Sequence, residues 1–164
     1  MSKEQKIALG GGCHWCTEAV FQSLKGVTKV EQGYVASIKE NEWFSEAVIV
    51  YFKEAQIPLK ALIEIHLHTH KSTSNHTMRN KYRSAVYFYT SQQGEQINAI
   101  LKGCQREFNN QIITKSMLFN GFKPSSEAIQ NYYKKNPEKP FCKQYINPKL
   151  KLLRSKYSNY IKLN

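Results

Sequence analysis

The segment Ile7-Ala8-Leu9-Gly10-Gly11-Gly12-Cys13-His14-Trp15-Cys16 places three glycines and two cysteines directly after a short apolar run. Residues 7–9 predict a short buried strand that ends at the glycines. Apolar residues then recur at helical spacing and predict a helix from Cys16 to Leu24, which Gly26 closes. A strand, a flexible turn and a helix therefore meet at Cys13.

The rest of the chain alternates between strand and helix patterns. Further strands are predicted over 27–37, 43–52, 83–89 and 111–118, and further helices over 59–68, 91–109, 125–133 and 148–161. The polar residues 70–81 predict a loop. This order is typical of an α+β protein, and we predict a ferredoxin-like two-layer sandwich with a mixed sheet and a C-terminal extension.

Length and composition favour one globular unit. The 164 residues are 41% hydrophobic and 12% aromatic, which predicts a single catalytic domain over 1–164 with a basic extension from about residue 134. No apolar run approaches the roughly 20 residues that span a bilayer, and the run at 7–9 is too short for a signal peptide. We therefore expect a cytoplasmic monomer with no membrane partner.

The charge distribution is uneven. All twelve acidic residues are Glu, which excludes mechanisms that need Asp as a base or metal ligand. The net charge is +12, and residues 131–164 hold nine Lys or Arg and one Glu. Such a run is usually a solvated face, and the alternative is a basic nucleic-acid-binding module. Only four of the 24 basic residues are Arg, the type preferred for base and phosphate recognition, so we expect no nucleic-acid partner.

The cysteine pattern indicates thiol chemistry. Cys13 and Cys16 form a close pair, while Cys104 and Cys142 are isolated. A thiolate is the reactive form of cysteine, and the free N–H groups at a helix start lower a thiol pKa. Cys13 is therefore the predicted nucleophile, which an imidazolium at His14 could reinforce. Cys16 has the spacing of a redox partner.

Other interpretations of these residues remain open. Two cysteines at a helix start can simply be small buried residues. A CxxC pair is also half of a zinc site, but no second pair exists. His66, His68 and His70 lack the HExxH spacing and predict a polar helix end rather than a metal site. A CxxC turn after a strand also fits a thioredoxin-like disulfide oxidoreductase, although only twelve residues precede Cys13. We expect no metal and no cofactor.

Several stretches of the chain resemble the A-type peptide methionine sulfoxide reductases. The first runs from Gly11 to Phe21 and on to Gly33-Tyr34, and is similar to the signature GCFWxxE…F…L.GV…GY. The others, in the family's order, are Ser45-Glu46-Ala47-Val48, Tyr82-Arg83-Ser84-Ala85-Val86-Tyr87, and the closing segment from Tyr132-Tyr133 through Asn136-Pro137 and Phe141-Cys142 to Pro148-Lys149-Leu150. Together they cover nearly the whole chain.

The resemblance implies reduction of methionine S-sulfoxide, free or in peptides. The Cys13 thiolate would attack the sulfoxide sulfur, while Glu46 corresponds to the acid that protonates its oxygen and Tyr82 to a tyrosine that hydrogen-bonds it. A carboxyl group kept neutral by an apolar pocket can supply such a proton. Trp15 would wall the pocket for the substrate methyl group, and His14 and Tyr34 are the other substrate-binding residues that we predict.

The resemblance also implies how the enzyme is recycled. Cys13 is left as a sulfenic acid, a second thiol converts it to a disulfide, and thioredoxin restores the dithiol. Cys16 is the predicted resolving thiol because of its spacing, followed by Cys142 and then Cys104.

The sequence departs from the family in three places. The family's Phe after the nucleophile is His14, which predicts a more polar methyl pocket. The segment 70–81 is shorter than the family's loop and lacks its acidic residue. The loop between Tyr34 and Glu46 is shorter too, with no counterpart to a second substrate tyrosine. A family member that has lost its activity is a further alternative.

Overall fold

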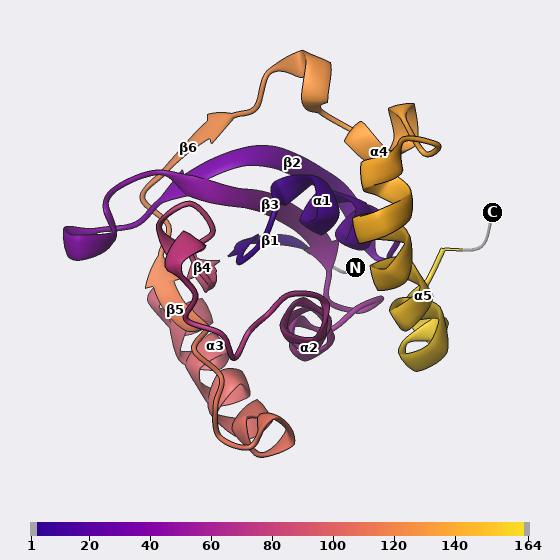
Figure 1. Cartoon of the computed structure of the whole chain (residues 1–164). Helices are drawn as coiled ribbons and strands as arrows, with labels where there is room; N and C mark the ends of the chain where they lie inside the picture. Colours follow the sequence, from indigo (N-terminus) through magenta and orange to yellow (C-terminus); the bar gives the residue numbers. More distant parts are fainter. Residues whose placement is uncertain (1–2, 163–164) are drawn as a thin grey trace.

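The computed structural model describes residues 3–162, which form a mixed sheet flanked by helices (Figure 1). The strands are β1 (Glu4–Gly10), β2 (Val27–Ala36), β3 (Ser45–Lys53), β4 (Ala85–Phe88), β5 (Lys115–Leu118) and β6 (Gly121–Pro124). The helices are α1 (His14–Gln22), α2 (Leu59–Thr69), α3 (Ser91–Cys104), α4 (Tyr132–Lys135) and α5 (Asn147–Lys156). None of the helices in this range is long and apolar enough to cross a membrane.

The sheet has the strand order β5-β4-β1-β3-β2-β6. Neighbouring strands are antiparallel except β4 and β5, which are parallel, so the sheet is mixed and the class is α+β, as predicted. In the register Gly10 lies opposite Ala47 and Glu46 lies opposite Tyr34. The end of β1, the start of β3 and the end of β2 therefore lie side by side at one end of the central strands.

Both faces of the central strands are buried. Ile7 and Leu9 of β1 pack with α1, α2 and α3 in the main core, together with Phe21, Leu62 and Ile97. The alternate residue, Ala8, belongs to a smaller cluster on the opposite face. Burial on both faces explains why the central strands read as apolar runs rather than as a simple alternation.

A buried carboxylate attaches the C-terminal extension to the body of the protein. Glu18 of α1 is only 1% exposed. It accepts hydrogen bonds from the Gln32 side chain at 3.0 Å and from the backbone N–H groups of Asn131 at 2.9 Å and Tyr132 at 3.1 Å. Figure 1 shows the chain running from β6 around the molecule to α4 and α5 beside α1.

After residue 118 the structure contains one strand that was not predicted, and one predicted helix was wrong. The strand β6 was missed because Gly121 and Pro124 disfavour a strand, yet both are tolerated where β6 pairs only with β2 at the sheet edge. The helix predicted over 125–133 is instead a 3₁₀ turn at Glu127–Ile129 followed by α4. Asn131 adopts a left-handed φ of 57°, which interrupts any continuous helix.

Other differences concern the ends of elements and the segments between them, and the helix predicted over 148–161 ends at Lys156. The helix predicted over 91–109 ends at Cys104 and continues as a 3₁₀ turn, and the strand predicted over 111–118 begins only at Lys115. The predicted loop 70–81 contains a 3₁₀ turn at Thr77–Asn80. Before α5, residues Cys142–Ile146 form a π-helix where a loop was predicted.

Candidate active site

The glycine turn places Cys13 at the start of α1, as predicted. Cys13 is the N-cap residue, and its carbonyl accepts the N–H groups of Cys16 at 3.1 Å and Thr17 at 3.2 Å. Gly11 has a φ of 152°, and a Cβ there would lie 2.5 Å from the His70 ring. The turn therefore needs glycine for both its conformation and its close contact with the loop beneath it.

The surroundings of Cys13 favour the thiolate. Its pKa is lowered first because the Cys16 thiol donates a hydrogen bond to its sulfur, and also because the backbone N–H groups of Trp15 and Cys16 point at it. Burial and the negative charge of Glu46 oppose this effect. The Cys16 pKa is raised for the complementary reason, since its proton is held in the hydrogen bond to Cys13.

The other cysteines lie at different distances from the nucleophile. Cys16 and Cys142 are buried in one cluster with Ile146, and the half-buried Cys13 packs against it. Burial raises the pKa of Cys142. Cys104 belongs instead to the main core beneath the sheet. The structure therefore places Cys16 and Cys142, but not Cys104, beside Cys13.

Glu46 lies at the start of β3 with its carboxylate against the beginning of α1. Its Oε1 accepts the His14 backbone N–H at 3.2 Å and lies 3.4 Å from His14 Nε2. The opposite ring nitrogen, Nδ1, lies 2.8 Å from the Gly33 carbonyl oxygen. The imidazole predicted to reinforce the thiolate is thus directed toward Glu46 and β2 instead.

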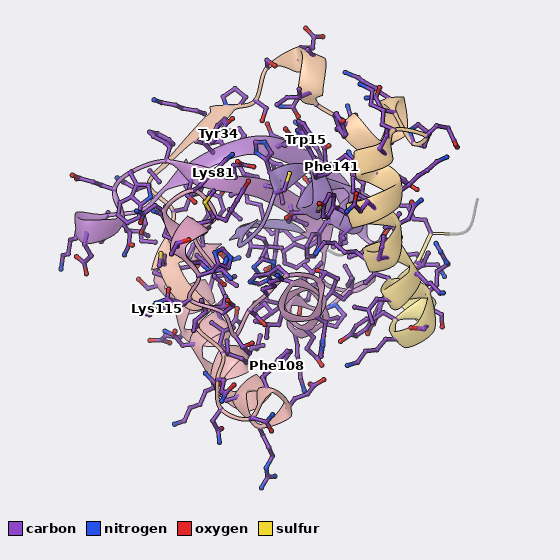
Figure 2. The ribbon with its side chains drawn as sticks, in the orientation of Figure 1. Trp15, Tyr34, Lys81, Phe108, Lys115 and Phe141 are labelled. Atoms are coloured by element: carbon purple, nitrogen blue, oxygen red, sulfur yellow. The ribbon has the colours of Figure 1, made fainter. Side chains whose placement is uncertain are left out.

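One pocket of about 410 Å³ is lined by all the predicted site residues except Cys16. Its walls come from α1, the facing ends of β2 and β3, the segment before β4, and the C-terminal extension; the lining residues are Cys13, His14, Trp15, Tyr34, Phe44, Glu46, Lys81, Tyr82, Ile129 and Phe141. Figure 2 shows Trp15, Tyr34, Lys81 and Phe141 gathered in this region, far from Phe108 and Lys115. Cys16 is not among the lining residues.

Aromatic rings form one wall of the pocket. Trp15 stacks on Tyr132 with ring centroids 3.9 Å apart and meets Phe141 edge-on at 5.2 Å. Phe141 was not singled out as a site residue, because nothing local in its segment indicates a pocket. The wall joins α1 to the C-terminal extension, so the extension is part of the site.

Lys81 and Lys149 are two cations that the sequence analysis did not assign to the site. The Lys81 ammonium lies 3.6 Å from Glu46 Oε2, and its pKa is raised by contact with the Tyr82 hydroxyl and then by Glu46. Lys149 of α5 donates a hydrogen bond to the Thr69 carbonyl. Burial lowers the pKa of Lys149, whereas the charges of Cys16 and Cys13 raise it. The Lys149 ammonium therefore lies close enough to both cysteines to interact with them.

The histidine cluster is largely buried rather than the polar helix end that was predicted. His66 and His70 stack with centroids 4.1 Å apart, and His70 Nε2 lies 2.8 Å from Ser84 Oγ. Burial lowers the pKa of His66 well below its usual range and that of His70 to about 3. Within residues 3–162, no group of three or more His, Cys, Asp or Glu side chains is placed to hold a metal ion.

Arg79 fixes the shortened loop beneath the glycine turn. Its guanidinium donates to the carbonyls of Gly11 at 2.7 Å, Tyr82 at 2.8 Å and Ser74 at 2.9 Å, and also to that of Lys71. All of these acceptors are backbone atoms. One side chain thus connects the nucleophile turn, the loop and the segment that carries Tyr82.

Comparison with known proteins agrees with this geometry. A family model for peptide methionine sulfoxide reductase matches residues 5–161. The chain belongs to the peptide methionine sulfoxide reductase family. The protein named peptide methionine sulfoxide reductase MsrA from Psychrobacter sp. is 34% identical over 178 residues, covering 96% of this chain and 98% of that protein. The MsrA of Acinetobacter baumannii (strain AYE) is 30% identical over 172 residues, covering 96% and 99%. The predicted resemblance to A-type reductases is confirmed.

Solved structures of reductases have the same fold. Mxr1 from Saccharomyces cerevisiae in its reduced form superposes with a TM-score of 0.74 at 22% identity, covering 85% of this chain and 90% of that one. Mxr1 in complex with Trx2 superposes with a TM-score of 0.64 at 22% identity, covering 79% and 85%. At this identity the likeness concerns the fold of these reductases.

Proposed function

We propose that this reductase converts methionine S-sulfoxide, free or in peptides, to methionine in a thiol-dependent reaction. The observation that carries the proposal is the convergence of Cys13, Glu46 and Tyr82 on one pocket, with a Cys13 pKa lowered by three hydrogen-bond donors. The family membership and the relatives named MsrA point to the same activity.

Each group has a role that follows from its position. The Cys13 thiolate attacks the sulfoxide sulfur, and Glu46 supplies the proton that the sulfoxide oxygen needs before it can leave sulfur. Tyr82 donates a hydrogen bond to the same oxygen. Trp15 and Tyr34 form the apolar surface that receives the methyl group and side chain of the substrate. The products are methionine and the sulfenic acid of Cys13.

Cys16 is the proposed resolving thiol. It already donates a hydrogen bond to the Cys13 sulfur, so the two sulfurs need little movement to form a disulfide as water leaves. Cys142 is the second candidate because it is buried beside Cys16. Thioredoxin then returns the disulfide to two thiols, a partner suggested by the complex of Mxr1 with Trx2.

The test of the activity uses both epimers of methionine sulfoxide, free and within a peptide. We expect the wild type to reduce the S epimer with thioredoxin, and Cys13→Ser to reduce neither. Turnover of both epimers at equal rates, or turnover that survives in Cys13→Ser, would contradict the proposal. To test the resolving thiol, mass spectrometry after one turnover should find a 13–16 disulfide in the wild type. A Cys16→Ser protein that still forms an intramolecular disulfide would overturn that assignment.

The two alternative functions are less well supported. A thioredoxin-like oxidoreductase would reduce insulin disulfides rapidly without turning over sulfoxide, and the family match argues against it. A nucleic-acid-binding module would use the basic extension as its surface, but Lys149 within it is half-buried near the cysteines. Salt-sensitive binding to nucleic acid that survives Cys13→Ser would revive that function.

The remaining proposals concern organisation and location. We propose that β4, β1, β3 and β2 with α1 and α2 form a ferredoxin-like core within a two-layer sandwich, since these strands lie in that order and are antiparallel. The chain over 1–164 is then a single catalytic domain, with the extension from about residue 134 packed on α1. That the protein is cytoplasmic and monomeric stays a prediction, which cell fractionation and light scattering can test.

A further inference from the structure

The contact between His14 and Glu46 carries an inference that rests on the proposed reaction. We infer that His14 is a positioning residue that shares one proton with Glu46 and keeps that proton available for the sulfoxide oxygen. The two residues are 32 positions apart and nearly buried, with His14 4% and Glu46 6% exposed. Their relation is therefore set by the fold and not by the local sequence.

The orientation of the His14 ring is fixed at three points. Nδ1 lies 2.8 Å from the Gly33 carbonyl oxygen, and because a carbonyl only accepts, Nδ1 must carry a hydrogen. The ring of Tyr34 packs edge-on against it at 5.2 Å. Nε2 then lies 3.4 Å from Glu46 Oε1. With Nδ1 protonated, Nε2 is the nitrogen that can take up or release a proton.

The pair therefore holds one exchangeable proton between Nε2 and Oε1. The proton can reside on Glu46, beside a neutral imidazole, or on His14, beside a carboxylate. Both arrangements contain the same number of protons and have no net charge, so the proton can pass between the two groups without changing the charge of the pair. Loss of the proton leaves a net charge of −1 in a buried place, which is unfavourable.

The neighbouring groups link this proton to the nucleophile. From α1, the Cys13 thiolate faces Glu46, whose negative charge raises the Cys13 pKa. From the segment before β4, Lys81 lies 3.6 Å from Oε2, but its side chain is 57% exposed and screened by water, and Tyr82 lies beside it. From β2, Tyr34 contacts the ring. A proton held by His14 and Glu46 cancels the negative charge that opposes the Cys13 thiolate. The thiolate and the protonated pair therefore stabilise each other.

The proton balance of the reaction closes with this assignment. The Cys13 sulfur bonds to the sulfoxide sulfur while the proton of the pair passes to the sulfoxide oxygen. The hydroxyl then moves to the Cys13 sulfur, and methionine leaves with the electron pair on its sulfur. Cys13 loses the two electrons that the substrate gains, and Glu46 is left as a carboxylate beside a neutral His14. When thioredoxin later restores the Cys13 thiol, the proton released by ionisation of that thiol returns to His14 and Glu46.

Two substitutions at His14 test the inference with a matched control. His14→Phe keeps the ring shape without either nitrogen, whereas His14→Asn can still donate to Gly33 but has no atom that can share the proton. The control is His68→Phe, which removes another His–Glu contact, the 2.7 Å pair with Glu107 outside the pocket. The rate of methionine release in a single turnover is measured from pH 5 to 9.

As the pH is raised, both His14 variants should lose activity earlier than the wild type, so that the alkaline limb of the pH profile moves down by one pH unit or more. This shift means about a tenfold slower turnover on that limb, while activity at acidic pH is kept. His68→Phe should follow the wild-type profile. The inference is overturned if both His14 variants also follow the wild-type profile. It is likewise overturned if the alkaline limb moves in His14→Phe but not in His14→Asn, because loss of the hydrogen bond to Gly33 would then be the cause.

A measurement that does not need activity separates this inference from the proposed function. In ¹⁵N NMR of the histidine rings, we expect His14 Nδ1 to stay protonated throughout, and the titration of Nε2 to change in Glu46→Gln. An Nε2 resonance that is indifferent to Glu46→Gln would overturn the shared proton. A wild type that shows this coupling but reduces no sulfoxide would refute the proposed function alone.

Discussion

Replacing Glu18 with Gln should loosen the C-terminal extension from the body of the protein. The carboxylate accepts three hydrogen bonds, two on Oε1 from Gln32 and Tyr132 and one on Oε2 from Asn131. A glutamine can keep its oxygen in the Oε1 position, but its NH₂ group must then face the Asn131 N–H. One charge-assisted hydrogen bond is lost and a donor meets a donor, which costs about 2 kcal/mol of the free energy of unfolding.

The stability change can be measured by urea and thermal unfolding. For a chain of this size we expect the midpoint temperature to fall by about 4–8 °C in Glu18→Gln, and further in Glu18→Ala, which removes the acceptor of all three hydrogen bonds. Limited proteolysis should cut near residues 131–139 sooner than in the wild type. Because Tyr132 stacks on Trp15, the KM for sulfoxide should rise as well.

Glu138→Gln is the matched control, since it removes an exposed carboxylate of the same extension that forms an ion pair with the exposed Lys143. It should leave stability unchanged within error, as is usual for surface ion pairs. If Glu18→Gln were equally silent, the buried carboxylate would not be what attaches the extension, and the reasoning from its hydrogen bonds would fail.

Three further predictions concern the thiols and the histidines. Cys16→Ala removes the thiol that donates to Cys13, so the midpoint pH for alkylation of Cys13 by iodoacetamide should rise; an unchanged midpoint would assign the lowered pKa to the helix N–H groups alone. Lys149→Met removes the cation near Cys16, which should slow disulfide formation in a stopped-flow experiment without changing the first burst of methionine, and equal slowing of both steps would contradict this role. His70 stays neutral in the folded protein down to about pH 3, while an unfolded histidine is protonated below about pH 6.5. The part of the stability that depends on His70 should therefore be complete above pH 6.5 and fall by up to about 1.4 kcal/mol per pH unit below it, and His70→Gln should remove this part of the slope in urea titrations at successive pH values.

The central elements could be predicted because their signals are local. Ile7-Ala8-Leu9 is apolar, the glycines after it stop a strand, and the residues after Cys13 have helical spacing. The position of Cys13 at a helix start follows from that short segment alone. The roles proposed for Glu46 and Tyr82 came from the family resemblance, since a glutamate in a strand and a tyrosine before one carry no functional signal of their own.

What could not be predicted depends on contacts between distant residues. β6 forms despite Gly121 and Pro124 because β2 offers an edge. The helix expected over 125–133 fails because Glu18, more than 100 residues earlier, holds the N–H groups of Asn131 and Tyr132. The direction of the His14 side chain likewise depends on Gly33 and Glu46, which only the folded sheet brings to it.

The way in which Arg79 holds the loop beneath the active site has a consequence for how this family can diverge. Its guanidinium binds the backbone carbonyls of Lys71 and Ser74, and every residue type offers such a carbonyl. Substitutions at these two positions therefore leave the contacts intact, whereas loss of Arg79 removes them all at once. The residue types at positions 71 and 74 can therefore change while Arg79 still gives the same support to the nucleophile turn. Sequence identity at these two positions is thus a poor measure of whether the site is preserved.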